Sequence, residues 1–276
     1  MKTGYGMIVA LALLIFAGCG SKSGTGDEID SRPGEEKTSA QSEQRSDNRL
    51  TALVKSPAQD KVEYPDFSTP EILQKILGKA ILWDTLEERG LEGEKLYYAP
   101  GSKTPYTGWR KRMHGNGKVQ MVSHIKDGKW EGPYVSWHDN GEKKSECTYE
   151  DGGLDGLYTS WYDNGERASE RTYKDGELDG LYTMWCSNGE RREATYKDGK
   201  REGPHTMWHG NGQKALERIY KDGELEGLMA SWHDNGQKKS ERTYKDGKRE
   251  GLMTVWDKDG TLVSQTRYIG GVKLVE

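Results

Sequence analysis

The chain has 276 residues, of which 41 are Lys or Arg and 45 are Asp or Glu, so its formal net charge is −4. Only 32% of the residues are hydrophobic, whereas 36 are glycine, about twice the usual share. This composition argues against a deep globular core. The charges alternate along the chain and form no basic stripe, which argues against nucleic-acid binding.

The N-terminus has the features of an export signal. Residues 1–18 contain one cation, Lys2, followed by an apolar run over residues 7–16. That run is too short to cross a bilayer as a helix, so it predicts a secretory signal peptide. An ordinary signal peptide or an uncleaved anchor is the alternative to the more specific hypothesis that follows.

Small residues precede a cysteine at the end of this signal. The sequence Ala17-Gly18-Cys19 resembles a bacterial lipobox, which implies that Cys19 carries the lipid of a lipoprotein. Gly20 follows the cysteine, and under bacterial sorting rules this favours the outer membrane. We therefore expect an exported chain that is lipid-anchored in the cell envelope.

Residues 19–64 are predicted to be a disordered tether. Most of this stretch consists of Ser, Gly, Glu, Asp, Lys and Arg. Such a composition buries too little apolar surface to offset the chain entropy lost on folding. As a flexible coil it would reach on the order of 40 Å, enough to hold a folded body clear of lipid headgroups.

Residues 65–93 are predicted to form a helical cap on the open end of the following array. Thr69 is a suitable N-cap, with Pro70 at the first helical position and Glu71 in the first turn. Residues 81–86 either extend this helix or begin a first strand. Terminal units of repeat arrays need such covers.

A unit of about 24 residues recurs seven times between residues 94 and 276. Its first glycine falls at Gly108, Gly132, Gly156, Gly180, Gly203, Gly227 and Gly251. A structural tryptophan follows five residues later at Trp137, Trp161, Trp185, Trp208, Trp232 and Trp256. A turn such as Asn140-Gly141 and a tyrosine such as Tyr149 complete the unit. This period marks an array whose units bury apolar surface only against their neighbours.

The local chemistry of each unit predicts a β-hairpin. The Asn-Gly pair lies between two runs with alternating character and tolerates positive φ at both turn positions. A second turn, Asp-Gly, leads into the next unit. We therefore predict an all-β fold, an elongated single-sheet meander of tandem β-hairpins. The fourth copy is one residue short between Gly189 and Tyr196, which predicts a local kink there.

Alternation assigns side chains to two faces of the predicted sheet. Leu157, Thr159 and Trp161 share one side, which we predict to be the core ladder together with the tyrosines of the second strands. The other side is unusually rich in Tyr and Met, which can adapt to several partners. The candidate interaction face consists of Tyr134, Tyr158, Tyr182, Met184, Met207, Met229 and Met253. An equally weighted alternative is that twist and curvature partly bury both faces.

The pattern resembles the MORN repeat, specifically its bacterial variant, which pairs a Gly-x-x-x-x-Trp strand with an Asn-Gly turn and a Tyr-x-x-Gly strand end. The phrase Lys103-Thr104-Pro105-Tyr106-Thr107-Gly108 also looks like the start seen in that family. The resemblance covers residues 94–276. It implies a β-hairpin array used for protein–protein contacts. Some MORN proteins are linked to membrane lipid, and many bacterial variants are labelled antitoxin-like.

Two ladders of polar residues could suggest chemistry. One follows the tryptophan position and reads His114, His138, Tyr162, Cys186, His209, His233 and Asp257; the other consists of the acids before the first glycines, such as Glu131 and Glu226. Equivalent residues in successive units should lie ~10 Å apart, whereas zinc ligands lie ~2.0–2.3 Å from one centre. We therefore expect no metal site, no catalytic residues, no cofactor and no enzymatic activity.

The sequence thus predicts a membrane-tethered β-repeat scaffold that binds a protein partner in the bacterial cell envelope, with an antitoxin-like role as one form of this activity. The alternative is an envelope protein that binds glycan or lipid headgroups through exposed aromatic side chains. A third interpretation is a passive spacer. The partner itself is not identified by the sequence.

Overall fold

The computed structural model describes residues 64–274 except 66, 68, 92 and 93. The predicted signal peptide, Cys19 and nearly all of the predicted tether lie outside the described residues. Among the residues that are described, no helix has the length and apolar character of a membrane span.

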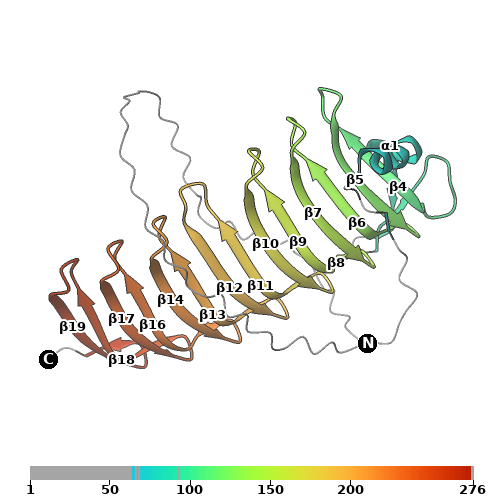
Figure 1. Ribbon diagram of the computed structural model, residues 1–276. Coiled ribbons are helices and arrows are strands. Elements are labelled where there is room, and N and C mark those ends of the chain that lie inside the picture. The colour runs from blue at the N-terminus through green and yellow to red at the C-terminus, as the bar shows by residue number, and fades with distance from the viewer. Residues whose placement is uncertain (1–63, 66, 68, 92–93, 275–276) are drawn as a thin grey trace, which may run out of the picture. The chain divides into compact units, whose positions relative to one another are not determined.

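One sheet of 18 strands contains the whole repeat array, and strands that follow one another in the chain lie next to one another in the sheet (Figure 1). This confirms the predicted single-sheet meander. Its pairings are antiparallel except for that between β1 (Ile81–Leu82) and β4 (Gly108–Met113), which is parallel. The remaining strands are β5 (Val119–Lys126), β6 (Lys129–Trp137), β7 (Lys143–Glu150), β8 (Gly153–Leu154), β9 (Gly156–Trp161), β10 (Arg167–Lys174), β11 (Glu177–Trp185), β12 (Arg191–Lys197), β13 (Lys200–Trp208), β14 (Lys214–Lys221), β15 (Glu224–Leu225), β16 (Gly227–Trp232), β17 (Lys238–Lys245), β18 (Lys248–Trp256), β19 (Leu262–Ile269) and β20 (Val272–Lys273).

A helix begins at Pro70, where the sequence predicts it. Helix α1 (Pro70–Lys79) has Thr69 as its N-cap residue and Ile76 as its buried side chain. It is followed by β1 and the 3₁₀ turn η1 (Trp83–Thr85), while β2 (Glu87–Arg89) and β3 (Leu96–Tyr98) form a separate two-stranded sheet. Lys111 Nζ of β4 donates to the carbonyl of Leu77 at 2.6 Å. The helix and β1 therefore lie against the first strand of the array.

The sequence predicts that the Asn-Gly pair forms the tight hairpin turn, but in the structure the Asp-Gly pair has this conformation. Asp127 and Gly128 have φ values of 49° and 82°, and the residues on either side of them pair, as in a two-residue type I′ hairpin. Among the described residues, positive φ outside glycine occurs only at the aspartates of these turns. At the Asn-Gly turn, Asn140 Oδ1 accepts a hydrogen bond from the Glu142 amide at 2.9 Å. The asparagine thus stabilises a longer loop through its side chain.

A β-bulge explains how the shortened fourth copy keeps its register. In six hairpins the second strand has one extra residue beside the loop; in the third copy, Trp161 pairs with Arg167 and Ser160 with Ser169. In the fourth copy Trp185 pairs with Arg191 and Met184 with Arg192, with no shift. The missing residue is therefore the bulge residue, and its loss leaves the side chains on their usual faces.

Cross-strand pairing defines two faces, because residues directly opposite each other share a side of the sheet. We call the side with Tyr158 and its partner Arg171 the Tyr face, and the side with Thr159 and its partner Glu170 the Trp face. The six structural tryptophans lie on the Trp face. Both faces are partly buried, with Ser169 of the Tyr face 3% exposed and Thr183 of the Trp face 5% exposed. Burial therefore matches the alternative of two partly covered faces.

The predicted core ladder is wrong in part. Leu157 and Leu181 are 55% and 53% exposed, because they lie toward one end of their strands on the Trp face. The threonines that follow them on the same face are buried instead. The thin core is thus divided between the two sides of the sheet.

Candidate interaction face

The Tyr face brings together the residues predicted as the interaction face. Pairing relates Tyr158 to Arg171 and Arg171 to Tyr182 across neighbouring strands. In an adjacent row Met184 and Met207 both lie opposite Arg192. By the same pairing and strand alternation, one side of the sheet carries Tyr134, Tyr158, Tyr182, Met184, Met207, Met229 and Met253. These side chains are half-buried or, for Met229, buried.

The second-strand tyrosines lie on this same face, not on the predicted core side. Each pairs with the first glycine of its own repeat, as Tyr173 does with Gly156, which sets its parity with Tyr158. The ring centroids of Tyr158 and Tyr173 are 6.4 Å apart, and those of Tyr182 and Tyr196 are 6.2 Å apart. The face is therefore more aromatic than the sequence indicates, with pairs of rings at distances where aromatic groups attract.

Arginines lie between these rings. The guanidinium of Arg171 is 5.4 Å from the Tyr158 ring centroid and 4.9 Å from that of Tyr182, within cation–π range. Arg218 and Arg242 occupy equivalent positions in later repeats, 5.2 Å and 6.0 Å from tyrosine rings. Sequence reasoning did not single out these three arginines. Each of the three lies two residues before the tyrosine of its own strand, and this spacing is the signal that could have found them.

Carboxylates are segregated from these arginines. The strand glutamates pair with residues of the Trp face, as Glu170 does with Thr159 and Thr183. Among the described residues no ion pair involves Arg171, Arg218 or Arg242. Arg171 Nε is also buried without a hydrogen-bond partner. Although the charges of the whole chain nearly balance, the Tyr face therefore carries arginines that no nearby carboxylate neutralises.

The Trp face is electrostatically compensated. Lys143 lies 5.3 Å from the Trp161 ring centroid of the next repeat and 2.7 Å from Glu146. Cation, glutamate and tryptophan recur in the following units, with Arg191 4.0 Å from the Trp208 ring. The tryptophans and their cations thus join one repeat to the next.

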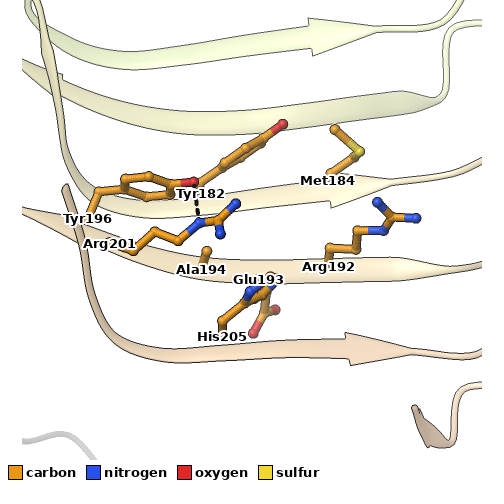
Figure 2. A pocket seen from close by; sticks show the side chains of 8 residues that line it. All are labelled: Tyr182, Met184, Arg192, Glu193, Ala194, Tyr196, Arg201 and His205. Carbon is orange, nitrogen blue, oxygen red and sulfur yellow. Dashed lines mark hydrogen bonds between the residues drawn. The ribbon is translucent and has the colours of Figure 1, made fainter. Parts of the chain in front are cut away.

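A shallow hollow lies on the Tyr face at the fourth and fifth repeats (Figure 2). Tyr182, Met184, Ala194, Tyr196 and His205 are among its lining residues. Its volume is about 20 Å³, room for roughly one water molecule. A wider open hollow of about 680 Å³ lies at the first repeats, beside Trp130 and Tyr134. At the fourth and fifth repeats, the geometry suits contact with an extended surface better than enclosure of a small ligand.

His205 is a buried titratable group in the smaller hollow. It is 4% exposed, and Arg218 Nε donates a hydrogen bond to its Nδ1 at 3.0 Å. Burial, reinforced by Arg218 and other nearby arginines, lowers the pKa of His205 to about 4. The imidazole is therefore neutral at pH 7 and accepts the arginine's hydrogen bond.

Arg110 joins the N-terminal cap to the array. It is fully buried, with its guanidinium 3.3 Å from the ring centroid of Trp83 and 3.4 Å from that of Trp130. Its Nε donates to Ser123 Oγ at 2.6 Å, while both terminal nitrogens are buried without hydrogen-bond partners. Burial lowers the pKa of Arg110 to about 9. The stacking of one arginine between two tryptophans holds η1 against the first two repeats.

Residues of the two polar ladders form hydrogen bonds between successive repeats. His138 Nε2 lies 3.0 Å from the Trp161 carbonyl, and Tyr162 donates to the Trp185 carbonyl at 2.7 Å. The acids before the first glycines accept amide hydrogen bonds from the following turn, as Glu226 does from Asp246 at 2.9 Å. These residues position neighbouring repeats.

A family model described as the MORN repeat variant matches residues 130–151, 154–175 and 225–246. Each matched segment contains the Trp-face tryptophan and the second-strand tyrosine of one unit. The chain is therefore a repeat protein that contains MORN repeat variant units. No curated protein matches the chain.

Proposed function

We propose that the chain is a non-enzymatic scaffold of the bacterial cell envelope whose Tyr face binds another protein. The proposal includes export and anchoring through a lipid on Cys19, with the outer membrane as the destination. The observation that carries the binding activity is the repeated row of tyrosine, methionine and arginine on one side of the sheet. Tyrosine and arginine are enriched at residues that dominate protein–protein binding energy.

The charge distribution favours a partner with acidic residues. Arg171, Arg218 and Arg242 each lie over a tyrosine ring, and no carboxylate is close enough to them to form an ion pair within the described chain. A carboxylate brought by a partner would form charge-assisted hydrogen bonds with these guanidinium groups. An extended acidic segment could contact several repeats at once, because the arginines recur along the array.

The test uses the full chain in mild detergent as bait for a crosslinked envelope extract. One variant carries Arg171→Gln, Arg218→Gln and Arg242→Gln on the Tyr face. The matched control carries Arg167→Gln, Lys214→Gln and Lys238→Gln on the Trp face, with the same loss of charge. Circular dichroism first establishes that both variants fold. We expect one acidic protein to be captured by the parent and the control, and lost from the Tyr-face variant or at high salt.

Equal capture by all three baits would contradict a binding site on the Tyr face. Binding of the parent to vesicles of anionic lipid or to cell-wall glycan, with no protein captured, would favour the alternative of headgroup or glycan recognition. An antitoxin-like role additionally requires that the captured protein be toxic and that the chain suppress its toxicity.

A further inference from the structure

The seventh repeat lacks the two side-chain donors that join the first, second, fifth and sixth repeats to their successors. In the sixth repeat His233 Nε2 lies 3.1 Å from the Trp256 carbonyl, and Asn235 Nδ2 donates to the Lys258 carbonyl at 2.7 Å. The equivalent residues of the seventh repeat are Asp257 and Asp259. An ionised carboxylate cannot donate a hydrogen bond to a carbonyl.

Asp257 instead bonds within its own loop. Its Oδ1 accepts from the amides of Asp259 and Thr261 at 3.0 Å and 2.8 Å. The Asp257 side chain thus forms its hydrogen bonds within the loop and offers no donor to a further repeat. The seventh repeat is built as a terminating unit.

The edge strand of this unit has also lost the charges of its predecessors. Relative to β17, β19 has Leu262 in place of Lys238, Gln265 in place of Glu241, and Ile269 in place of Lys245. Leu262 and Ile269 are 52% and 57% exposed, and Val263 beside them is 62% exposed. Edge strands are ordinarily protected from association by charged residues, particularly lysine. Here the strand at the edge is less charged than the interior strand it repeats.

Part of this edge is open to pairing. Strand β20 pairs with Tyr268 and Ile269, and the Leu274 amide donates to the Arg267 carbonyl at 2.9 Å. In the described part of the chain, no strand pairs with the outer side of residues 262–266. Their outward backbone groups are available to a strand from another molecule.

We propose that this edge pairs with the same edge of a second copy, in an antiparallel arrangement with Ser264 opposite Ser264. A two-fold axis normal to the sheet keeps the Tyr faces of both copies on one side. It places Val263 opposite Gln265, with no like charges facing each other. The bulge between Leu262 and Ser264 puts Leu262 outside the regular pairing, at the end of the contact.

The central pair repeats a contact that the array already uses. The hydroxyls of Ser136 and Ser145 are 2.7 Å apart across a strand pair, and those of Ser231 and Ser240 are 2.8 Å apart. Ser264 lies in the same row of the Tyr face, opposite Val255. A second Ser264 across the two-fold axis would give it the hydroxyl partner that these interior serines have.

Charge complementarity favours a second copy as the occupant. Antiparallel pairing directs the acidic loop at Asp257 and Asp259 of each copy toward the other copy's Arg267 and Lys273. Both cations lie at the far end of the edge and are exposed, and within the described chain neither forms an ion pair. The two-fold axis makes this contact twice.

The first test is sedimentation of the full chain in excess mild detergent over a concentration series. The edge variant carries Leu262→Lys, Gln265→Glu and Ile269→Lys, the residues that the same fold accepts in the sixth repeat. The control carries Leu157→Lys and Leu181→Lys, which remove exposed apolar side chains from the Trp face without touching the edge. We expect a monomer–dimer equilibrium in the parent and the control, weakened about tenfold or more in the edge variant.

A second test examines the register. Opposed residues of an antiparallel pair have Cα atoms ~4.5–5.5 Å apart, within disulfide range. Ser264→Cys should therefore form a covalent dimer under mild oxidation, above the level in the parent, whereas Ser240→Cys inside the sheet should not.

A chain that stays monomeric at every concentration would overturn the proposal. So would a dimer that the edge variant retains, or a reversible dimer that Ser264→Cys fails to trap. Loss of the dimer in the edge variant together with trapping by Ser264→Cys would support it.

Discussion

At the scale of single residues, His205 makes the stability of the array depend on pH. Its folded pKa of about 4 lies below the ordinary value of 6.5, so the unfolded chain binds the proton more readily than the folded chain between these values. The stabilisation is complete above about pH 6.5 and is lost as the pH falls toward 4. The loss amounts to up to ~3 kcal/mol from this one group.

Replacing His205 by Met tests this dependence, because Met229 occupies the equivalent position in the next repeat and accepts contacts from Arg242 in the same way. We expect the variant to lose less stability than the parent between pH 7 and pH 4.5, by ~2–3 kcal/mol. Urea unfolding at the two pH values measures the difference, and carboxylate contributions common to both proteins cancel. Identical pH slopes would show that His205 titrates normally.

The sequence correctly predicted which residues of one strand lie on opposite faces. It did not predict how the residues of two paired strands align. Tyr158 and Thr159 lie on opposite faces as predicted, because that follows from the period of two. Tyr173 was assigned to the wrong face, because its position depends on how the two strands of a hairpin align. That alignment is set by a bulge beside Trp161, which alternation alone does not reveal.

At the scale of the hairpin, the bulge predicts where the chain tolerates an insertion. Adding one alanine between Arg191 and Arg192 would give the fourth repeat the bulge residue found in the six others. We expect this insertion to change the free energy of unfolding by no more than about 1 kcal/mol. One alanine inserted between Thr183 and Met184 should instead exchange the faces of the next two residues. Met184 would move to the Trp face and Trp185 to the Tyr face.

The second insertion should destabilise the protein by more than about 3 kcal/mol, since it removes a tryptophan from its contacts. Denaturant titration of both variants provides the comparison. Equal destabilisation by the two insertions would mean that the bulge does not set the register of the hairpin.

The hairpins were predictable because their signals are local. The Asp-Gly turns, the tryptophan period and the helix start at Pro70 each depend on a few adjacent residues. The site was less predictable, because Arg171 acquires its setting from rings in two neighbouring strands. A cation lying among aromatic rings follows from register across the sheet, and its local sign in the sequence is an arginine two residues before a second-strand tyrosine.

At the scale of the whole array, the contacts between units repeat with the period of the sequence. Deleting residues 156–179 removes one complete unit and joins Asp155 to Gly180. The hydrogen bond from His138 to the Trp161 carbonyl would then be made to the Trp185 carbonyl instead, and the Asp-Gly turns would stay at the same edge of the sheet. Stability in such arrays is approximately a sum of unit and interface terms, so the shortened chain should fold.

We expect this deletion to lower the melting temperature by about 5 °C or less, with a single cooperative transition in circular dichroism. Deleting only residues 168–179 removes one strand, so every later hairpin loop emerges at the opposite edge. The histidine and asparagine hydrogen bonds across that junction are then lost, and the melting temperature should fall further although half as many residues are removed. If the longer deletion is the more damaging of the two, stability depends on the number of strands and not on the periodic contacts between whole repeats.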